Sequence, residues 1–361
     1  MRTLFLSLAA PAILTVGLVA CSEPQTPGVN NPVSVQSSES AMSENTDVSA
    51  VAANPFFEAS QLSLNYPQFD LIQTGHYLPA FECGMAEQLA EVEAIASQGE
   101  SPDFENTIIA LELSGQLLDR VSRVFFSMSS AHTNDEIRSL QQQLAPQLAA
   151  HSDAILLNRA LFARIQTLFD QRQELALEPE ALRLLEKYHL DFVRAGAALT
   201  ESDQDRMREI NAEMATLQTQ FSQNVLSEVN DLAIVVDSEE EMAGLDEALK
   251  QAASEEAAER GLPGKYVIPL LNTSGQPALA SLQNRSVRQR IFETSLSRGS
   301  RGGDFDNRDV LSKVLSLRAE RSALLGFANH AEFILANQTA QTVEAVNQRL
   351  AELAAPAVAN V

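Results

Sequence analysis

Five histidines are the side chains best suited to metal binding or acid–base chemistry, because their ring nitrogens bind zinc and titrate near neutral pH. They are His76, His132, His151, His189 and His330. No two of them stand four residues apart or form an H-x-H pair, so the sequence indicates neither a helix-borne zinc pair nor a compact metal site. Each is expected to be an ordinary core or surface residue.

The other reactive patterns are incomplete. Cys83 has no nucleophile context, no G-x-S-x-G elbow is present, and this cysteine is expected to be a small apolar residue on a helix. Residues 261–265 lack the spacing of a phosphate-binding loop, and Tyr266 stands where a magnesium-binding hydroxyl belongs, so a turn before a strand is predicted. The acidic run 239–241 is interpreted as a solvated face, and 299–303 as a loop. Residue spacing therefore indicates no catalyst.

Cys21 is the one residue whose context predicts a specific chemistry. It ends the sequence LVAC at 18–21, which has the residue types of a bacterial lipobox, and it follows a cationic start and an apolar run at 4–20. That run is shorter and more broken than the roughly 20 apolar residues of a membrane span. We predict that residues 1–21 are a lipoprotein signal peptide and that Cys21 is lipidated. The alternative is an ordinary secretory signal with an incidental cysteine.

The residues after Cys21 predict a tether and a membrane location for the protein. Residues 22–53 are rich in Ser, Pro, Asn and Glu, and bury too little apolar surface to offset the entropy of ordering, so a flexible tether is expected. Ser22 stands where an aspartate would resemble a signal for retention in the inner membrane. We therefore expect an exported protein on the outer membrane, facing the periplasm, with the lipid anchor as its only membrane contact.

Composition restricts the remaining possibilities. The 361 residues include 48 acidic and 25 basic side chains, a formal net charge of -23, and this charge repels a phosphate backbone and excludes nucleic acid as a partner. Two cysteines cannot form a disulfide framework. The absence of tryptophan and the small number of Gly and Pro residues favour helices over a sandwich or barrel.

Residues 54–361 are predicted to be mainly α, with long antiparallel helices. Apolar residues three and four apart predict one helix over 102–128 and another over 200–225, the second starting from Thr200. Shorter repeats of the same spacing predict helices at 137–148, 161–169, 184–193, after Asn284, and at 306–325. The amphipathic segment that starts at Thr342 is still running at Val361, which favours a natural polypeptide that continues.

A small β element is expected to interrupt these helices. Residues 232–236 and 265–271 are short runs rich in β-branched or aromatic side chains, the second bounded by Gly264 and by an Asn-Thr-Ser-Gly turn. The acidic stretch 238–260 between them is expected to be a solvated helix or loop.

Several stretches of residues 54–361 resemble, in order, the N-terminal portion of bacterial peptidyl-dipeptidases (dipeptidyl carboxypeptidases). These belong to the zinc metallopeptidase family of thimet oligopeptidase and oligopeptidase A. The matching stretches are NPFF from Asn54, PDFENTIIALELSG from Pro102, VFFSMSSAHTND from Val124, LAAHSDAILLN from Leu148, DFVRAGAALTESD from Asp191, LNTSGQPALASLQNRSVRQRIFE from Leu271 and LRAERSALLGFANHAEFIL from Leu317.

This resemblance implies a helical fold of two lobes that flank a deep channel, with this chain forming one wall and short peptides as substrates. The family binds zinc through an H-E-x-x-H helix and a later glutamate, and neither element is found in these residues. No catalytic or metal-binding role is therefore carried over to any residue of this chain, and the chain alone is predicted to be inactive. Its partner would be its own C-terminal catalytic portion, and residues 265–271 would lie near the channel or form a structural sheet.

Two alternatives remain open from the sequence. One is a metalloendopeptidase similar to oligopeptidase A. The other is a lipid-anchored helical protein that binds peptides without cleaving them.

Overall fold

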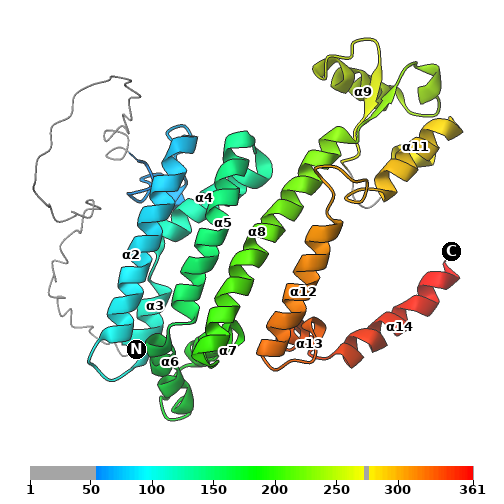
Figure 1. The fold of residues 1–361 in the computed structure, drawn as a ribbon. Helices are drawn as coiled ribbons and strands as arrows, with labels where there is room; N and C mark the ends of the chain where they lie inside the picture. Colours follow the sequence, from blue (N-terminus) through cyan, green and yellow to red (C-terminus); the bar gives the residue numbers. More distant parts are fainter. Residues whose placement is uncertain (1–53, 272–275, 361) are drawn as a thin grey trace, which may run out of the picture. The chain divides into compact units, whose positions relative to one another are not determined.

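The computed structural model describes residues 54–271 and 276–360 (Figure 1), so the predicted signal peptide at 1–21 and the tether at 22–53 lie outside the described residues. From Pro55 onward the chain packs as one unit, and it is mainly helical with one small sheet, as the sequence predicts. None of the helices in the described ranges combines the length and the apolar character needed to cross a bilayer.

The first helices pack around two apolar clusters that share α2 (Tyr77–Ser97). Phe81 of α2 and Phe125 of α4 meet edge to face in the first cluster, with ring centroids 5.4 Å apart. Leu168 and Phe192 lie in the second cluster with the C-terminal half of α2. The other helices of these clusters are α4 (Gln116–Ala131), α5 (Asp135–Leu156), α6 (Arg159–Asp170) and α7 (Pro179–Ala195).

The segment 102–128 is not a single helix, and the prediction of one was wrong. Asp103 caps a π-helical turn, Phe104–Ile109, which continues into α3 (Ala110–Glu112). The chain then breaks at Gly115, whose φ of 71° is left-handed, before α4 begins. The apolar spacing continues across the break because apolar residues on both sides of it are buried. Those before Gly115 pack in the cluster around Leu168, and those after it pack in the cluster around Phe81.

Helix α8 (Glu201–Asp231) lies between α5 and α12 (Arg308–Leu324), as Figure 1 shows. It begins where the sequence predicts, because the Thr200 hydroxyl accepts a hydrogen bond from the backbone N–H of Asp203. Buried Ile210 of α8 packs with Leu317 of α12. Gly326, with a left-handed φ of 81°, follows the end of α12, a position that favours glycine.

The predicted β element is a two-stranded antiparallel sheet of β1 (Ile234–Val236) and β2 (Tyr266–Ile268), shorter than its predicted ranges. Val236 and Val267 are fully buried, and Val236 belongs to an apolar cluster that includes Val287 and Ile291. The helices near this sheet are α9 (Glu247–Glu259), the short α10 (Ala278–Ser281) and α11 (Arg285–Leu296), the last capped by the predicted Asn284.

The described chain ends with α13 (His330–Leu335) and α14 (Val343–Ala359). Thr342 caps α14 by accepting a hydrogen bond from the backbone N–H of Ala345 at 3.1 Å. No residue of α14 is buried, and its apolar side chains Leu350 and Leu353 are more than half exposed.

A buried arginine ties α6 to the segment before α3. Arg164 is 7% exposed, and its guanidinium donates to the Glu100 carbonyl at 3.0 Å, the Asn106 side chain at 2.8 Å and the Thr107 hydroxyl at 3.3 Å. All three acceptors lie far from Arg164 in sequence and none is a carboxylate. This residue therefore acts as a structural cross-link built from hydrogen bonds.

We expect Arg164→Lys to lower the free energy of unfolding by about 2–4 kcal/mol, because an ammonium cannot reach acceptors arranged around a planar fork. Urea unfolding followed by circular dichroism measures the change. Arg183→Lys is the matched control, since Arg183 forms an exposed ion pair with Glu186 and should change stability by less than about 0.5 kcal/mol. Equal losses in the two variants would show that the network around Arg164 contributes nothing.

Candidate functional site

His151, His189 and His132 lie in different surroundings. Buried His151 of α5 shares a hydrogen bond of 2.7 Å with Gln88 of α2, and burial lowers its pKa. His189 stacks on Phe169 with ring centroids 3.7 Å apart, and His132 is exposed after α4. His151 is therefore buried beside α2, His189 is half-buried against Phe169, and His132 lies at the surface.

The other weak motifs also have the structures expected of them. Residues 261–265 form a turn that leads into β2, with left-handed φ values at Gly261 and Gly264. Glu239 of the acidic run is exposed and pairs with Lys250 at 3.1 Å. Cys83 lies half-buried on α2, with its thiol 3.6 Å from the Glu87 carboxylate.

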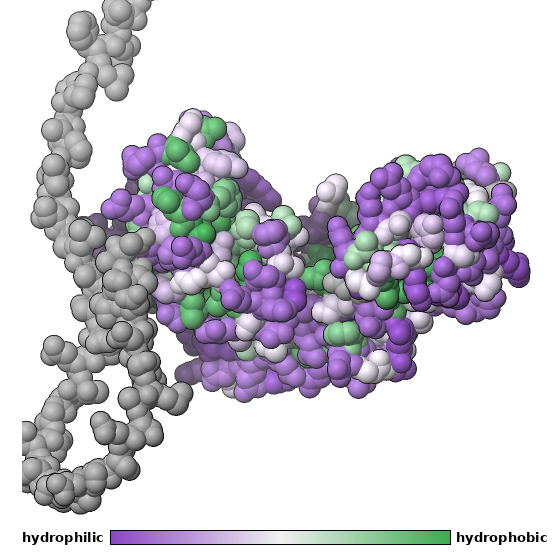
Figure 2. All heavy atoms as spheres, turned by 90° about the horizontal axis from the view of Figure 1, so that it is seen from above, coloured by the Kyte–Doolittle hydropathy of each residue, from purple (hydrophilic) through white to green (hydrophobic). Residues whose placement is uncertain are grey.

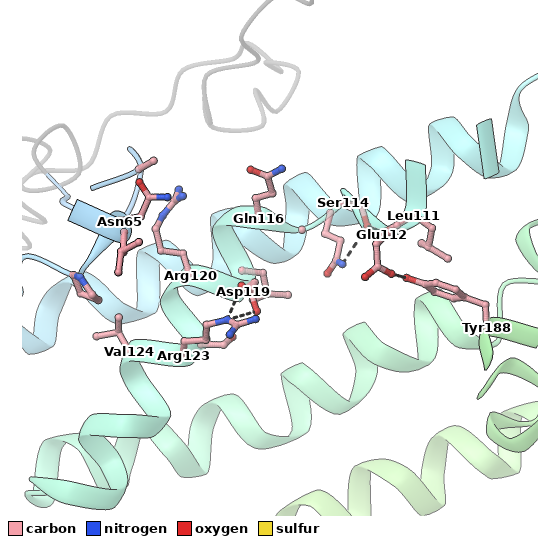
Figure 3. A pocket seen from close by; sticks show the side chains of 17 residues that line it. Asn65, Leu111, Glu112, Ser114, Gln116, Asp119, Arg120, Arg123, Val124 and Tyr188 are labelled. Carbon is pink, nitrogen blue, oxygen red and sulfur yellow. Dashed lines mark hydrogen bonds and ion pairs between the residues drawn. The ribbon is translucent and has the colours of Figure 1, made fainter. Parts of the chain in front are cut away.

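A cavity of about 930 Å³ lies between the segment 59–67, α2, the start of α4 and Tyr188 of α7 (Figure 3). Its charged groups are largely paired with one another or with the backbone. The Tyr188 hydroxyl donates to the Glu112 carboxylate, and Arg123 pairs with Asp119 at 2.7 Å. Arg120 donates from Nε to the Phe56 carbonyl at 2.9 Å.

These pairings limit what the cavity can do chemically. Burial and the neighbouring Glu112 carboxylate raise the pKa of Tyr188, so its hydroxyl acts as a hydrogen-bond donor and not as a base. Figure 3 shows Glu112 and Tyr188 pointing toward each other at one end, and the Asp119–Arg123 pair between them and Asn65 at the other end. The cavity has hydrogen-bonding groups for a polar ligand, but its lining contains no nucleophile beside a base.

A zinc site does not fit the residues that the structure describes. Among them no group of three or more histidine, cysteine, aspartate or glutamate side chains is placed to hold a metal ion. A catalytic zinc needs three protein ligands at about 2.0–2.3 Å.

Apolar side chains form a second surface feature, on α11, α12 and α14. Leu311 and Leu315 of α12 are 47% and 54% exposed, and Leu296 of α11 is 69% exposed. Figure 2 shows apolar groups at the surface among the hydrophilic side chains of one face. Large exposed apolar side chains on a helix are compatible with coverage by a partner.

Comparison with known proteins identifies relatives. Residues 278–361 match the model of peptidase family M3. The chain is 41% identical to the dipeptidyl carboxypeptidase of Salmonella typhimurium over 307 residues, which are 85% of this chain and 45% of that protein. It is also 41% identical to the Escherichia coli dipeptidyl carboxypeptidase over 83% of this chain and 44% of that protein. Oligopeptidase A of Haemophilus influenzae is 29% identical over 80% of this chain and 43% of that protein.

The chain belongs to peptidase family M3. This confirms the resemblance seen in the sequence. The M3 chain spans about half the length of the curated relatives it matches.

The polar cavity of this M3 chain was not predicted from its sequence. Glu112 and Tyr188 stand 76 residues apart and become partners only through the packing of α7 beside α3. No local motif marks either residue, and only knowledge of the tertiary structure finds the pair.

We expect the purified chain of residues 1–361 to bind zinc at well below one equivalent, because its described residues contain no ligand set. Metal analysis by mass spectrometry after zinc loading and dialysis measures this. Binding of one equivalent of zinc that a chelator removes would contradict this prediction. If a variant lacking His132 and His151 still bound that zinc, the ligands would lie elsewhere in the chain.

Proposed function

We propose that this chain is the amino-terminal, non-catalytic portion of a zinc metallopeptidase that releases dipeptides from the C-termini of short peptides. The observation that carries the proposal is the 41% identity to two dipeptidyl carboxypeptidases over more than four-fifths of the chain. Oligopeptidase A relatives from three bacteria are only 27–29% identical over a similar stretch. This difference favours the peptidyl-dipeptidase branch.

In this proposal the metal and its ligands belong to a C-terminal portion that corresponds to the unmatched length of the relatives. The chain itself would supply one wall of a channel that admits short, unfolded peptides and excludes folded proteins.

The exposed apolar residues of α12 and α14 support a contact with that C-terminal portion. Leu350 and Leu353 lie on α14 at 58% and 52% exposure, and Leu315 of α12 is 54% exposed. Burial of apolar surface contributes about 25 cal/mol per Å², so covering these side chains would favour association. The occupant we propose for this surface is the metal-bearing portion of the same enzyme.

Two other functions remain as alternatives. A metalloendopeptidase similar to oligopeptidase A would use the same wall but cleave within peptides. A lipid-anchored protein that binds peptides without cleaving them is favoured only by the polar cavity beside Tyr188, which has hydrogen-bonding groups and no catalyst. A position of residues 265–271 near the channel stays a prediction under each of these functions.

We also propose that the protein is exported and held on the outer membrane, facing the periplasm, through a lipid on Cys21. The sequence LVAC at 18–21 and the polar stretch 22–53 support this location. Acyl chains contribute about 0.8 kcal/mol per buried methylene, so two or more chains would hold the protein stably.

We expect the product of the complete coding sequence to release a dipeptide from an N-blocked peptide with a free C-terminus, and a chelator to abolish this activity. Chromatography of the products identifies the released dipeptide. The same peptide with an amidated C-terminus is the control, and its cleavage at internal bonds would instead indicate an endopeptidase. Absence of hydrolysis of both peptides by zinc-loaded protein would contradict the peptidase proposal and favour the peptide-binding alternative.

We expect Cys21→Ser to move the protein from the membrane fraction to the soluble periplasmic fraction, because the serine hydroxyl cannot accept the thioether-linked lipid. Fractionation and immunoblotting measure the distribution. Cys83→Ser is the matched control and should remain with the membranes. Membrane attachment of the Cys21→Ser protein would show that the lipobox interpretation is wrong.

A further inference from the structure

Three arginines and a histidine gather where α7, α12 and α13 meet. The guanidinium carbon of Arg194 lies 4.2 Å from the centroid of the Phe333 ring, and that of Arg321 lies 5.5 Å from the same centroid. The ring of His330 lies 6.1 Å from Phe333, and the positive charges of Arg318 and Arg321 act on it. Phe333 is 6% exposed, and its ring stabilises the guanidinium groups of Arg194 and Arg321.

The arginines of this group differ from most others in the described part of the chain. Arg120, Arg164 and Arg206, for example, each donate hydrogen bonds to carbonyl or carboxylate oxygens. Within the described residues, the side chains of Arg194, Arg318 and Arg321 donate no hydrogen bond and lie within 4.0 Å of no carboxylate. Their hydrogen-bonding capacity is therefore unused.

Two of the polar atoms in this group are buried and have no partner. They are Nε of Arg321 and Nδ1 of His330. A buried donor without an acceptor is unfavourable, and in native proteins such an atom commonly marks a ligand, ion or water. Both atoms lie on the α12–α13 side of the group.

The carboxylates nearby do not balance the positive charge. Asp153 of α5 attracts Arg321, but it is 6% exposed and already accepts a hydrogen bond from Asn211 at 2.7 Å. Burial raises the pKa of Asp153 to about 6, which weakens it as a counter-ion in mildly acidic solution. Asp191, which attracts Arg194, forms an ion pair with Lys187.

We propose that Arg194, Arg318 and Arg321, together with His330, bind an oxyanion, either a carboxylate or a phosphate group. A guanidinium presents N–H groups in a planar fork that matches two oxygens of such an anion. An oxyanion at this position accepts from Nε of Arg321 and neutralises part of the positive charge around Phe333. The net charge of -23 repels anions from most of the molecule, so a local cluster of this kind is what selective anion binding requires.

The oxyanion can come from two sources, which share this chemistry. One is a small free anion such as inorganic phosphate or acetate. The other is the terminal carboxylate of a short peptide. The proposal does not depend on the peptidase function, because binding is measured without hydrolysis.

The first experiment compares the melting temperature of the full chain in sodium phosphate and in sodium chloride at equal ionic strength. At about ten times the dissociation constant we expect phosphate to raise the melting temperature by about 2–4 °C. Acetate is tested in the same way. Two short peptides, with a free and an amidated C-terminus, distinguish a peptide source from a free anion. Stabilisation by the free-carboxylate peptide alone would support the site and identify its ligand as a peptide terminus.

The matched variants are Arg321→Gln and Arg349→Gln. Arg321→Gln removes a cation from the group and should abolish the rise in melting temperature caused by phosphate. Arg349 is an exposed residue of α14 paired with Glu352, so Arg349→Gln should show the same rise as the parent chain. Because Arg321 also attracts Asp153, Arg318→Gln provides a second test by titration calorimetry, with at least about a ten-fold weaker affinity expected. An unchanged rise in Arg321→Gln, or no stabilisation of the parent chain by any of these oxyanions, would overturn the proposal.

Discussion

The packing of α8 between α5 and α12 is the interaction on which the rest of the described structure depends. On one side the Gln142 side chain of α5 donates to Gln223, and on the other Arg206 pairs with Glu320 of α12 at 2.6 Å. Asn224 near the end of α8 donates to buried Asn307, just before α12. Because α8 contacts both neighbours along its length, it joins the helices around α2 to the later elements. The polar contacts at this interface restrict the helices to one register, since a shift would leave buried amides without partners.

Features that depend on local sequence could be predicted, and those that depend on tertiary packing could not. The caps at Thr200, Asn284 and Thr342 lie where the sequence indicates, because a cap involves a few adjacent residues. The break at Gly115 was missed because the apolar spacing continues across it. The backbone N–H of Gly115 donates to the carboxylate of Glu91 on α2, a contact that no local pattern reveals.

The candidate site could be predicted from the sequence even less than the fold. Spacing along the sequence is enough to exclude the usual helical pair of zinc-binding histidines, because that pair needs two residues one turn apart. Spacing did not predict that residues as distant as Glu112 and Tyr188 would share a cavity, or that Arg194 would approach Phe333. Family membership came from whole stretches of similar sequence and not from reactive residues. A fold and its reactive residues are separate features of a sequence, so a family can be recognised without a reactive residue.

Arg164 and Arg321 differ in how their N–H groups are used. Arg164 directs its N–H groups at oxygens of its own chain, so it has little capacity left for a ligand. Arg321 is held against Phe333 but leaves a buried N–H without an acceptor. Desolvation disfavours a charged group, and burial lowers the pKa of Arg321 accordingly. A bound anion would offset the desolvation free energy of the Arg321 guanidinium. The presence or absence of hydrogen-bond acceptors therefore distinguishes Arg164 from Arg321 better than burial does.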